Sequence, residues 1–446
     1  MKFSLDDVAQ ATDGTVVRGV SDASARAASG IERRGIERVT IDSRSVEPGD
    51  LFVAVVAERD GHDFAVDAVR RGAQAVLAAR PLDLDVPVIV VGDTVEALTA
   101  LGRTARDRLS GPVVGVTGSV GKTSAKDLLA SICAVAGPVT ASEKSLNNEL
   151  GVPLTLINAA ADTERTIVEM GARGVGHIAH LRDIARPTIG LVTVVAMAHT
   201  ELFGSIDAVA AAKGELVEAL PADGFAVLNA NDERVAAMAS RTDAVVITYG
   251  AAAHVRAEHV TLDEALRPRF TLVSDWGRVS VRLAVAGPHN VSNALGAAAT
   301  ALQMGVDLDQ IAEGLELAAL SPSRMAVRPV PSGGVVIDDA YNANPTSMRA
   351  ALDSLAALDA DRRVAVLGYM AELGSDAPAE HRAIADYARS LGIDVVAVGT
   401  DLYGIDPLED VNAAIRTVAA PVRGEAVLLK ASRVAGLDRI AAAWSH

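Results

Sequence analysis

Short apolar runs alternate with helix-length segments over most of the chain. In the middle of the chain, the apolar runs predicted as strands are residues 113–117, 166–170, 189–195, 225–229 and 244–248. The same rhythm returns later, with predicted strands at residues 335–339, 363–368, 394–399 and 426–430. Strands separated by helix-length segments form mostly parallel sheets that are covered by helices. The pattern therefore predicts an α/β protein.

The N-terminal part has a more mixed pattern. Apolar runs at Leu51–Val56 and Val88–Val91 predict strands, and a helix is predicted near Phe64–Arg71. Residues 20–37 are rich in Ala, Ser and Arg and have no hydrophobic period, so we expect a loop there.

Two segments interrupt the strand and helix rhythm. Residues 268–286 alternate apolar and polar positions on both sides of Asp275-Trp276-Gly277, which predicts a β-hairpin at the edge of the central domain. The rhythm restarts after Ser321-Pro322-Ser323. A chain of 446 residues is long enough for about three domains. We predict a small α/β N-terminal domain, a central parallel-sheet domain and a C-terminal Rossmann-like domain that lacks GxGxxG, over residues 1–109, 110–320 and 321–446.

Composition excludes several classes of protein. Half of the residues are apolar but only 3% are aromatic, so the core must be aliphatic. The net charge of −16 argues against general nucleic-acid binding. The start, MKFSLDDVAQ, has no apolar signal region and no long uncharged apolar run follows, so we expect a cytoplasmic protein without membrane contact. The single cysteine, Cys133, excludes an internal disulfide or a cysteine-based zinc site, and we expect it in the core.

A glycine-rich segment lies between the predicted strand at 113–117 and a helix-like stretch at Ala125–Ala136. It reads Thr117-Gly118-Ser119-Val120-Gly121-Lys122-Thr123-Ser124. A strand, a glycine turn and a helix start gather backbone N–H groups around one small volume, which suits a phosphate chain. Lys122 would meet the β/γ-phosphate charge and the Thr123 hydroxyl would bind Mg²⁺. Val116 stands where the longer P-loop pattern has its first glycine, so this is the shorter TGSxGKT form. The segment predicts binding of ATP or a close relative; a glycine turn unrelated to nucleotides is the alternative.

Three polar residues near other central strands are candidates for the same site. Glu169 lies at the end of a predicted strand, where an open parallel sheet forms its ligand crevice. It is therefore a candidate metal ligand, with an exposed strand-end carboxylate as the alternative. His199 follows the next strand and Lys213 lies in a helix-like stretch. By themselves these two are typical of a structural histidine and a solvated lysine.

Further segments, in the same order along the chain, resemble the Mur ligase family. Besides TGSxGKTSAKD they are Asn147-Asn148-Glu149-Leu150-Gly151-Val152-Pro153, Val168-Glu169-Met170-Gly171-Ala172, Ala198-His199, Ala212-Lys213-Gly214-Glu215, Asn229-Ala230-Asn231-Asp232, Gly287-Pro288-His289-Asn290 with Asn293, Arg324, and Asp338-Asp339-Ala340-Tyr341-Asn342-Ala343-Asn344-Pro345. The resemblance implies an ATP-dependent amide ligase. In such an enzyme a carboxylate attacks the γ-phosphate to give an acyl phosphate and ADP, and an amine then displaces phosphate.

One motif distinguishes the branches of this family. Asp-x-Tyr-Asn-Ala-Asn-Pro at 339–345 resembles the branch that adds D-alanyl-D-alanine to a UDP-N-acetylmuramoyl-tripeptide in bacterial peptidoglycan precursor synthesis, and the DNPR motif of the branch that adds the third residue is absent. Residues 41–44, 48–54 and 60–64 resemble the UDP-substrate domain of the same branch. The three domains would then bind the UDP substrate, ATP and the amine, in chain order. We expect a monomer that acts on small molecules.

The resemblance also assigns roles to single residues. It implies that Thr123 and Glu169 hold one Mg²⁺, and that His199 and Lys213 hold a second, with Lys213 carrying a CO₂-derived carbamate. A lysine ammonium has no lone pair to offer a metal, whereas a carbamate offers two anionic oxygens. Two Mg²⁺ ions and Lys122 would stabilise the anions that meet in both steps. The remaining assignments are Asn147 and Asn148 for the substrate or phosphates, His289, Asn290 and Asn293 for adenine, Arg324 and Asp339 for the ATP phosphates and ribose, Ser43 and Arg44 for UDP, and Tyr341, Asn342 and Asn344 for the incoming amine.

Departures from the family pattern lie near the expected amine site. Tyr369 stands where the family usually has Asp, and Ala431 stands where it usually has Gly. One alternative is therefore a paralogue that joins a different carboxylate and amine in a dedicated pathway. A non-catalytic nucleotide-binding protein is another, and it is disfavoured because Lys122, Glu169, His199 and Lys213 are all retained. For the Asn342-Ala343-Asn344-Pro345 stretch alone, a turn before a helix is also an adequate interpretation.

Overall fold

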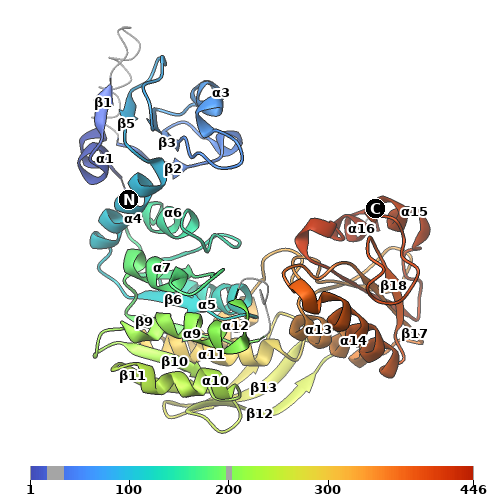
Figure 1. Ribbon diagram of the computed structural model, residues 1–446. Helices are drawn as coiled ribbons and strands as arrows, with labels where there is room; N and C mark the ends of the chain where they lie inside the picture. Colours follow the sequence, from blue (N-terminus) through green and yellow to red (C-terminus); the bar gives the residue numbers. More distant parts are fainter. Residues whose placement is uncertain (1, 18–34, 197–202, 445–446) are drawn as a thin grey trace. The chain divides into compact units, whose positions relative to one another are not determined.

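The computed structural model describes residues 2–17, 35–196 and 203–444, and the chain forms two compact units (Figure 1). Most of the predicted loop at 20–37 and the predicted metal ligand His199 lie outside the described residues. The first unit comprises Met1–Gly115, Pro138–Met170 and Ala179–Pro187, and the second comprises Val116–Gly137, Gly171–Ile178 and Thr188–His446. The strands form three sheets, with the orders β1-β5-β4-β3-β2, β14-β13-β12-β11-β10-β9-β6-β8-β7 and β15-β16-β19-β17-β18.

The first unit contains the five-stranded sheet that is formed by β1 to β5. β2, β3, β4 and β5 run parallel and β1 is antiparallel to β5. Phe52, Val76 and Val88 of this sheet form a core with Ala65 and Ala68 of the helix α3. The elements of this unit are α1 (Leu5–Thr12), β1 (Thr15–Val17), β2 (Arg38–Thr40), β3 (Asp50–Val53), α3 (Ala65–Arg71), β4 (Ala75–Ala78), β5 (Val88–Val90), α4 (Thr94–Asp107), β7 (Val139–Ala141), α6 (Gly151–Ile157) and β8 (Arg165–Glu169). Two elements cross the boundary between the units, β6 (Val113–Thr117) and α7 (His177–Ala185).

The central part of the second unit is a strand and helix array that ends in an antiparallel sheet. β9 (Ile189–Val192), β10 (Phe225–Asn229), β11 (Val245–Tyr249) and β12 (Val255–Leu262) are parallel neighbours. β12, β13 and β14 are antiparallel, and β13 and β14 form the predicted hairpin at the sheet edge. The other elements here are α5 (Lys122–Ala136), α9 (Ile206–Glu218), α10 (Glu233–Ala236), β13 (Pro268–Ser274), β14 (Gly277–Arg282), α11 (Asn290–Gln303) and α12 (Leu308–Leu317).

The prediction for the strand at 189–195 was too long at its C-terminal end. The strand β9 stops at Val192 because the next residue, Thr193, turns its hydroxyl to the glycine-rich loop. Thr193 Oγ1 donates to the carbonyl oxygen of Val120 at 2.6 Å, and Val194 pairs with Val120 in an isolated bridge. After Val192, Thr193 and Val194 therefore support the glycine-rich loop through Val120.

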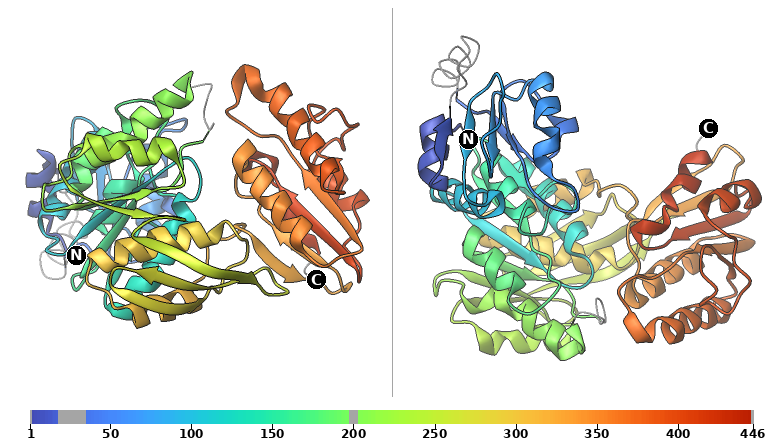
Figure 2. Two further views of the ribbon diagram at one scale, coloured as in Figure 1. Left: turned by 90° about the horizontal axis from the view of Figure 1, so that it is seen from below. Right: turned by 45° about the horizontal axis from the view of Figure 1, so that its top comes forward.

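The C-terminal part of the second unit has a sheet with apolar residues on both faces. Along β17, Ala365 and Leu367 belong to one core cluster, and Val364 and Val366 belong to another. The period of two places successive side chains on opposite faces. The helices α13 and α14 contribute to the first cluster, where they lie side by side (Figures 1 and 2), and α15 and α16 contribute to the second. The elements are β15 (Ala326–Pro329), β16 (Val335–Asp338), α13 (Pro345–Ala357), β17 (Arg362–Leu367), α14 (Ala377–Ser390), β18 (Asp394–Ala397), α15 (Val411–Thr417), β19 (Glu425–Lys430) and α16 (Asp438–Ala443).

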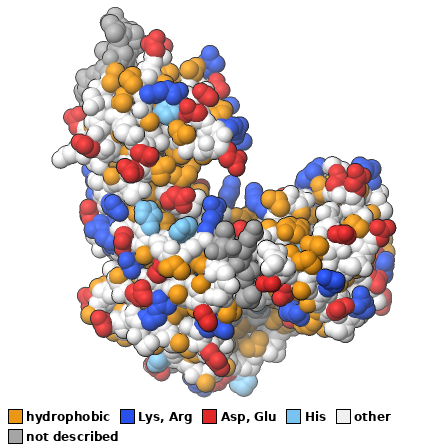
Figure 3. All heavy atoms as spheres, viewed as in Figure 1, with side chains coloured by type: hydrophobic (Ala, Val, Ile, Leu, Met, Phe, Trp, Pro, Cys, Tyr) orange, Lys and Arg blue, Asp and Glu red, His pale blue; other side chains and the backbone are white. Residues whose placement is uncertain are grey.

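On the face drawn in Figure 3, acidic side chains are interspersed with basic ones. Cys133 is fully buried on α5, as predicted. Among the helices of the described residues, none combines the length and apolar character that a membrane span needs.

Candidate active site

Two glycines give the loop between β6 and α5 a shape that other residues cannot adopt. Gly118 and Gly121 have φ values of 145° and 85°, in the region that favours glycine. A Cβ atom on Gly118 would lie 2.0 Å from Thr193 Oγ1, and one on Gly121 would lie 2.4 Å from Asn293 Oδ1. The predicted order of strand, glycine turn and helix is confirmed, and α5 begins at Lys122.

Lys122 lies against the loop that it follows. Its Nζ atom donates to the carbonyl oxygens of Gly118 at 2.7 Å and Ser119 at 3.4 Å. The Ser119 backbone N–H donates to Val194 O at 2.6 Å, and its hydroxyl donates to Ala196 O at 3.0 Å. The ammonium group is therefore held at the loop by bonds that also fix the loop itself.

Arg324 reaches the same loop from a distant part of the sequence. Its Nη2 atom donates to Thr123 Oγ1 at 3.2 Å, and its Nε atom is buried without a hydrogen-bond partner. The start of the same segment is anchored to α5, because Ser321 N–H donates to Asp127 Oδ2 at 2.8 Å. The buried Thr123 and its neighbour Ser124 thus lie beside a guanidinium group with an unused donor, as an anion site requires.

The residues predicted for adenine gather at the start of α11. Asn290 is fully buried, donates to Ala286 O at 2.6 Å and accepts from Asn293 Nδ2 at 2.8 Å. His289 Nδ1 is buried with no hydrogen-bond partner in the described structure. Burial lowers the pKa of His289, which favours a neutral ring. Asn293 lies against Gly121, so these three residues adjoin the phosphate loop.

Lys213 on α9 is buried, whereas its helix-like stretch by itself would be typical of a solvated lysine. Its exposed fraction is 2%, and its Nζ atom lies 5.9 Å from the centre of the Phe203 ring. Burial and the charge of Lys122 lower the pKa of Lys213 to about 7, and Glu215 acts in the opposite direction. A substantial fraction of the amine is therefore neutral near pH 7, and only the neutral amine reacts with CO₂.

Glu169, in the first unit, is a buried carboxylate at the end of β8. Its Oε1 atom accepts from Asn147 Nδ2 at 2.8 Å, and its Oε2 atom is buried without a partner. An oriented carboxylate with one unused oxygen fits a cation. The described residues contain no group of three or more His, Cys, Asp and Glu that could hold a metal. The predicted ligand sets include a threonine and a lysine, as well as His199, which is not described.

Asn148, also predicted for the substrate or phosphates, makes local bonds at the start of a helix. Its Oδ1 atom accepts from Gly151 N at 2.9 Å and from Leu150 N at 3.3 Å, which fixes the start of α6. The pairing of Asn147 with Glu169 was not foreseen from the sequence, because the two lie in separate motifs.

A buried ion pair organises the end of β19. Lys430 Nζ donates to Asp339 Oδ2 at 2.5 Å and to Asn342 O at 3.0 Å. Asp339 Oδ1 accepts from Met325 N at 3.1 Å. Lys430 is 2% exposed, so it fixes both the carboxylate predicted for ATP and the loop predicted for the amine. Nothing in the sequence pairs Lys430 with Asp339, because the two residues are 91 positions apart.

The residues predicted for the incoming amine are partly engaged in local bonds. Asn344 caps α13 by accepting from Ser347 N at 2.9 Å, with Pro345 at the first helical position. The turn-before-helix interpretation is therefore correct for this residue. Asn342 Oδ1 accepts from Ala343 N at 2.9 Å. Tyr341 contacts two guanidinium groups, with ring-centre distances of 4.1 Å to Arg324 and 5.1 Å to Arg433.

The candidates for UDP contacts, Ser43 and Arg44, form a 3-10 turn in the first unit. Arg44 pairs with Asp42 at 2.8 Å, and its side chain is 80% exposed. Its hydrogen bond to Asp42 holds the pKa of that carboxyl at about 2. An exposed pair of this kind is weak, so the arginine can exchange this partner for another anion.

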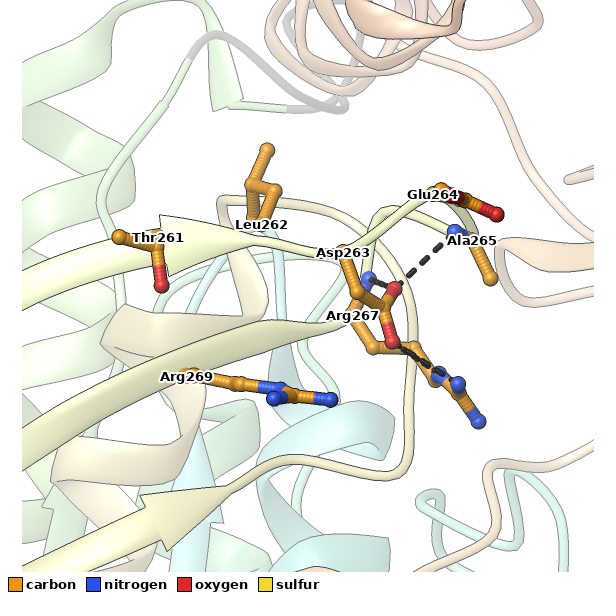
Figure 4. A pocket seen from close by; sticks show the side chains of 7 residues that line it. All are labelled: Thr261, Leu262, Asp263, Glu264, Ala265, Arg267 and Arg269. Atoms are coloured by element: carbon orange, nitrogen blue, oxygen red, sulfur yellow. Dashed lines mark hydrogen bonds and ion pairs between the residues drawn. The ribbon is translucent and has the colours of Figure 1, made fainter.

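A surface pocket lies at the turn between β12 and β13, and none of these candidate residues lines it (Figure 4). Asp263 accepts from Ala265 N, Arg267 N and Arg267 Nε there, so the turn satisfies its own polar groups. The lining residues are Thr261, Leu262, Asp263, Glu264, Ala265, Arg267 and Arg269.

The chain matches three family descriptions in succession. Residues 35–106 match the Mur ligase family catalytic domain, residues 116–301 match the Mur ligase middle domain, and residues 323–443 match the Mur ligase glutamate ligase domain. A UDP-N-acetylmuramoyl-tripeptide--D-alanyl-D-alanine ligase of Mycobacterium bovis is 42% identical, over 92% of both chains. The chain belongs to the Mur ligase family.

Solved Mur ligase structures show the same fold. MurF from Acinetobacter baumannii is similar with a TM-score of 0.86 and 30% identity, covering 99% of this chain and 98% of that one. MurF ligase from Thermotoga maritima, solved in complex with ADP, has a TM-score of 0.79 and 26% identity, covering 92% and 97%. The predicted three-domain α/β architecture is thereby confirmed; the exact limits at 109/110 and 320/321 remain predictions.

The two departures from the Mur ligase pattern differ in their consequences. Ala431 is fully buried in a core cluster, and a Cβ atom on Gly368 would lie 2.7 Å from its methyl group. The methyl group of Ala431 therefore lies in the core, where the backbone of Gly368 approaches it closely. Tyr369 is 36% exposed and stacks on the buried His381, with ring centres 5.3 Å apart. Of these two departures, only Tyr369 changes the surface.

The buried pair of Lys430 and Asp339 predicts a large stability effect. Lys430→Met leaves a buried carboxylate and the Asn342 carbonyl without their partner, so we expect a loss of about 3–5 kcal/mol in the free energy of unfolding. Adding Asp339→Asn should recover part of that loss. Urea unfolding, followed by the fluorescence of the buried Trp444 in a Trp276→Phe background, measures both.

The matched control is Lys2→Met, which removes an exposed pair with Glu37 at 3.4 Å. We expect almost no change for it, because exposed pairs contribute little. A Lys430→Met chain as stable as this control would contradict the inferred role of the buried pair.

Proposed function

We propose that this chain joins D-alanyl-D-alanine to a UDP-N-acetylmuramoyl-tripeptide, with conversion of ATP to ADP and phosphate, in peptidoglycan precursor synthesis. The observation that carries the proposal is the phosphate loop, where Lys122 and Arg324 converge on Gly118–Thr123. The similarity to ligases with this activity extends over 92% of the chain. We further propose that the chain acts as a monomer in the cytoplasm.

The reaction requires an inert carboxylate to become a good acyl donor. Its oxygen attacks the γ-phosphorus of ATP, the bond to the β-phosphate oxygen breaks, and ADP leaves. The dipeptide amine then attacks the acyl carbon, loses a proton and releases phosphate. Both steps bring negative charge together, so fixed cations aimed at the phosphates lower the barrier. Lys122 and Arg324 are placed to do so.

The proposed reaction calls for cations at the phosphates. We propose that Thr123 and Glu169 hold one ion, and that His199 and carbamylated Lys213 hold the other. The unpartnered Glu169 Oε2 and the low pKa of Lys213 support these assignments. The ions would neutralise phosphate charge and orient the reacting oxygens.

The remaining assignments complete the proposal. The range 1–109 would bind the UDP part through Ser43 and Arg44, and 110–320 would bind ATP. The range 321–446 would bind the amine. The residues proposed for the amine are Tyr341, Asn342 and Asn344. The remaining residues proposed for ATP and the donor are Asn147, Asn148, His289, Asn290, Asn293 and Asp339. The exposed Tyr369 leaves a ligase for a different amine as the second candidate.

Release of ADP by the purified protein tests this function. We expect release only when UDP-N-acetylmuramoyl-tripeptide and D-alanyl-D-alanine are both present, because the amine must open the acyl phosphate for turnover to continue. Lys122→Ala should reduce the rate by about 100-fold or more without unfolding, since it removes a charge that acts on the phosphates. The exposed Lys2→Ala is the matched control.

Two results would contradict this account. If no ADP is released with the tripeptide and dipeptide, but ADP is released with other amines, the second candidate is favoured. An unchanged rate for Lys122→Ala would remove the assigned role of the phosphate loop.

The carbamate on Lys213 predicts a dependence on CO₂ and pH. Because the pKa of Lys213 is about 7, the proton that blocks reaction with CO₂ is gained as the pH falls through that value. Activity should therefore be present above about pH 7 and be lost below it, and bicarbonate should restore enzyme depleted of CO₂. Rates of ADP release after incubation from about pH 6 to about pH 9 measure this.

Lys213→Ala provides the direct comparison. We expect it to be nearly inactive and to regain activity when acetate or formate is added, because a small carboxylate can replace the missing carbamate oxygens. A variant that no small carboxylate rescues would count against the carbamate.

A further inference from the structure

We propose that Arg433 binds the terminal carboxylate of the acceptor dipeptide and so selects amines that carry a free carboxylate. This inference rests on the proposed function and deepens it. It gives the amine site a specific anion receptor that the sequence motifs did not identify.

Arg433 lies where the C-terminal sheet presents its strand ends. β16, β19 and β17 are parallel neighbours that end at Asp338, Lys430 and Leu367. Ligands of open α/β sheets bind outside these carboxyl ends. Arg433 follows the end of β19 by three residues and begins a short 3-10 turn, Arg433–Ala435.

The backbone that carries Arg433 is rigid. The preceding Ser432 is 3% exposed, and its N–H donates to Tyr369 O at 3.0 Å. Its hydroxyl accepts from Ala371 N at 2.9 Å, which ties the loop after β19 to the loop after β17. The guanidinium then rests 5.1 Å from the Tyr341 ring centre. A receptor built on a fixed base loses little entropy when it binds.

The positive charge of Arg433 can bind an anion. Arg433 is exposed and forms no ion pair with the described part of the chain. Its guanidinium contacts the face of the Tyr341 ring. The nearby carboxylate of Asp339 is occupied by Lys430 at 2.5 Å. Tyr341 also contacts Arg324, at 4.1 Å, which bonds to Thr123 of the phosphate loop.

Two guanidinium groups thus contact the ring of Tyr341, and no ion pair within the described residues involves Arg433. Arg324 is bonded to the phosphate loop and so serves the nucleotide. Arg433 is left for a second anion, and its planar fork matches a carboxylate. The acceptor dipeptide carries a carboxylate at the end opposite its reacting amine.

The surroundings of Arg433 suit small side chains. The adjacent Val434 is 86% exposed, and the ring of Tyr341 lies against the guanidinium. An apolar side chain and an aromatic ring beside a guanidinium can contact methyl groups while the carboxylate is bound. A short dipeptide with methyl side chains and a free carboxylate matches this surface.

Removing the charge from either partner tests the contact. The rate of ADP release is measured with D-alanyl-D-alanine and with its C-terminal amide, for the wild type, for Arg433→Gln and for the control Arg439→Gln. Arg439 is an exposed arginine on α16 that donates to Asn412. We expect Arg433→Gln to raise KM for the dipeptide about 10- to 100-fold and to leave KM for the amide nearly unchanged. The control should match the wild type on both peptides.

Other outcomes would overturn the inference. An equal loss on both peptides would show that Arg433 has only a structural role. A raised KM for UDP-N-acetylmuramoyl-tripeptide, with the dipeptide unaffected, would assign Arg433 to the donor substrate. If the wild type releases no ADP with UDP-N-acetylmuramoyl-tripeptide and D-alanyl-D-alanine, both the proposed function and this inference are wrong. If the wild type is active, the variants test the role of Arg433 separately from the proposed function.

Discussion

Mutual repulsion of two anions is the constraint on which the rest of this structure depends. A carboxylate must approach the γ-phosphate of ATP, and the chain that brings them together has a net charge of −16. Positive charge must therefore be concentrated at one place rather than spread over the surface. The structure does this with Lys122 in the glycine loop and Arg324 bonded to Thr123. Burial lowers the pKa of Lys213, and the charge of Lys122 lowers it further.

The fold supplies the rigidity that these charges need. Gly118 and Gly121 let the loop pass close to Thr193 and Asn293, where a Cβ atom would clash. β9 ends early so that Thr193 can bond to Val120 O. Farther along the chain, the buried Lys430 holds Asp339 and Asn342 together. Each of these contacts holds a loop or a polar group in a fixed position.

The sequence predicted the features that depend on local patterns. The strand, glycine loop and helix around Lys122 and the hairpin of β13 and β14 follow from residue spacing alone. The partner strand β12 was missed, because Val255–Leu262 mixes charged and apolar residues without a clear period. The order of the family motifs identified the domain architecture.

Contacts between residues far apart in sequence could not be predicted. Asn147 orients Glu169, and Lys430 pairs with Asp339 across 91 positions. Neither pairing leaves a trace in the spacing of either motif. The surroundings of Ala431 could not be predicted either, since a motif shows that a methyl group is added but not that it faces the core.

Transfer of oxygen from the carboxylate to phosphate tests the central claim most directly. The terminal carboxylate of UDP-N-acetylmuramoyl-tripeptide would be labelled with oxygen-18, and the products of a complete reaction would be analysed by mass spectrometry. The account predicts one labelled oxygen in each released phosphate and unlabelled ADP. Label in AMP, with unlabelled pyrophosphate as the other product, would contradict it.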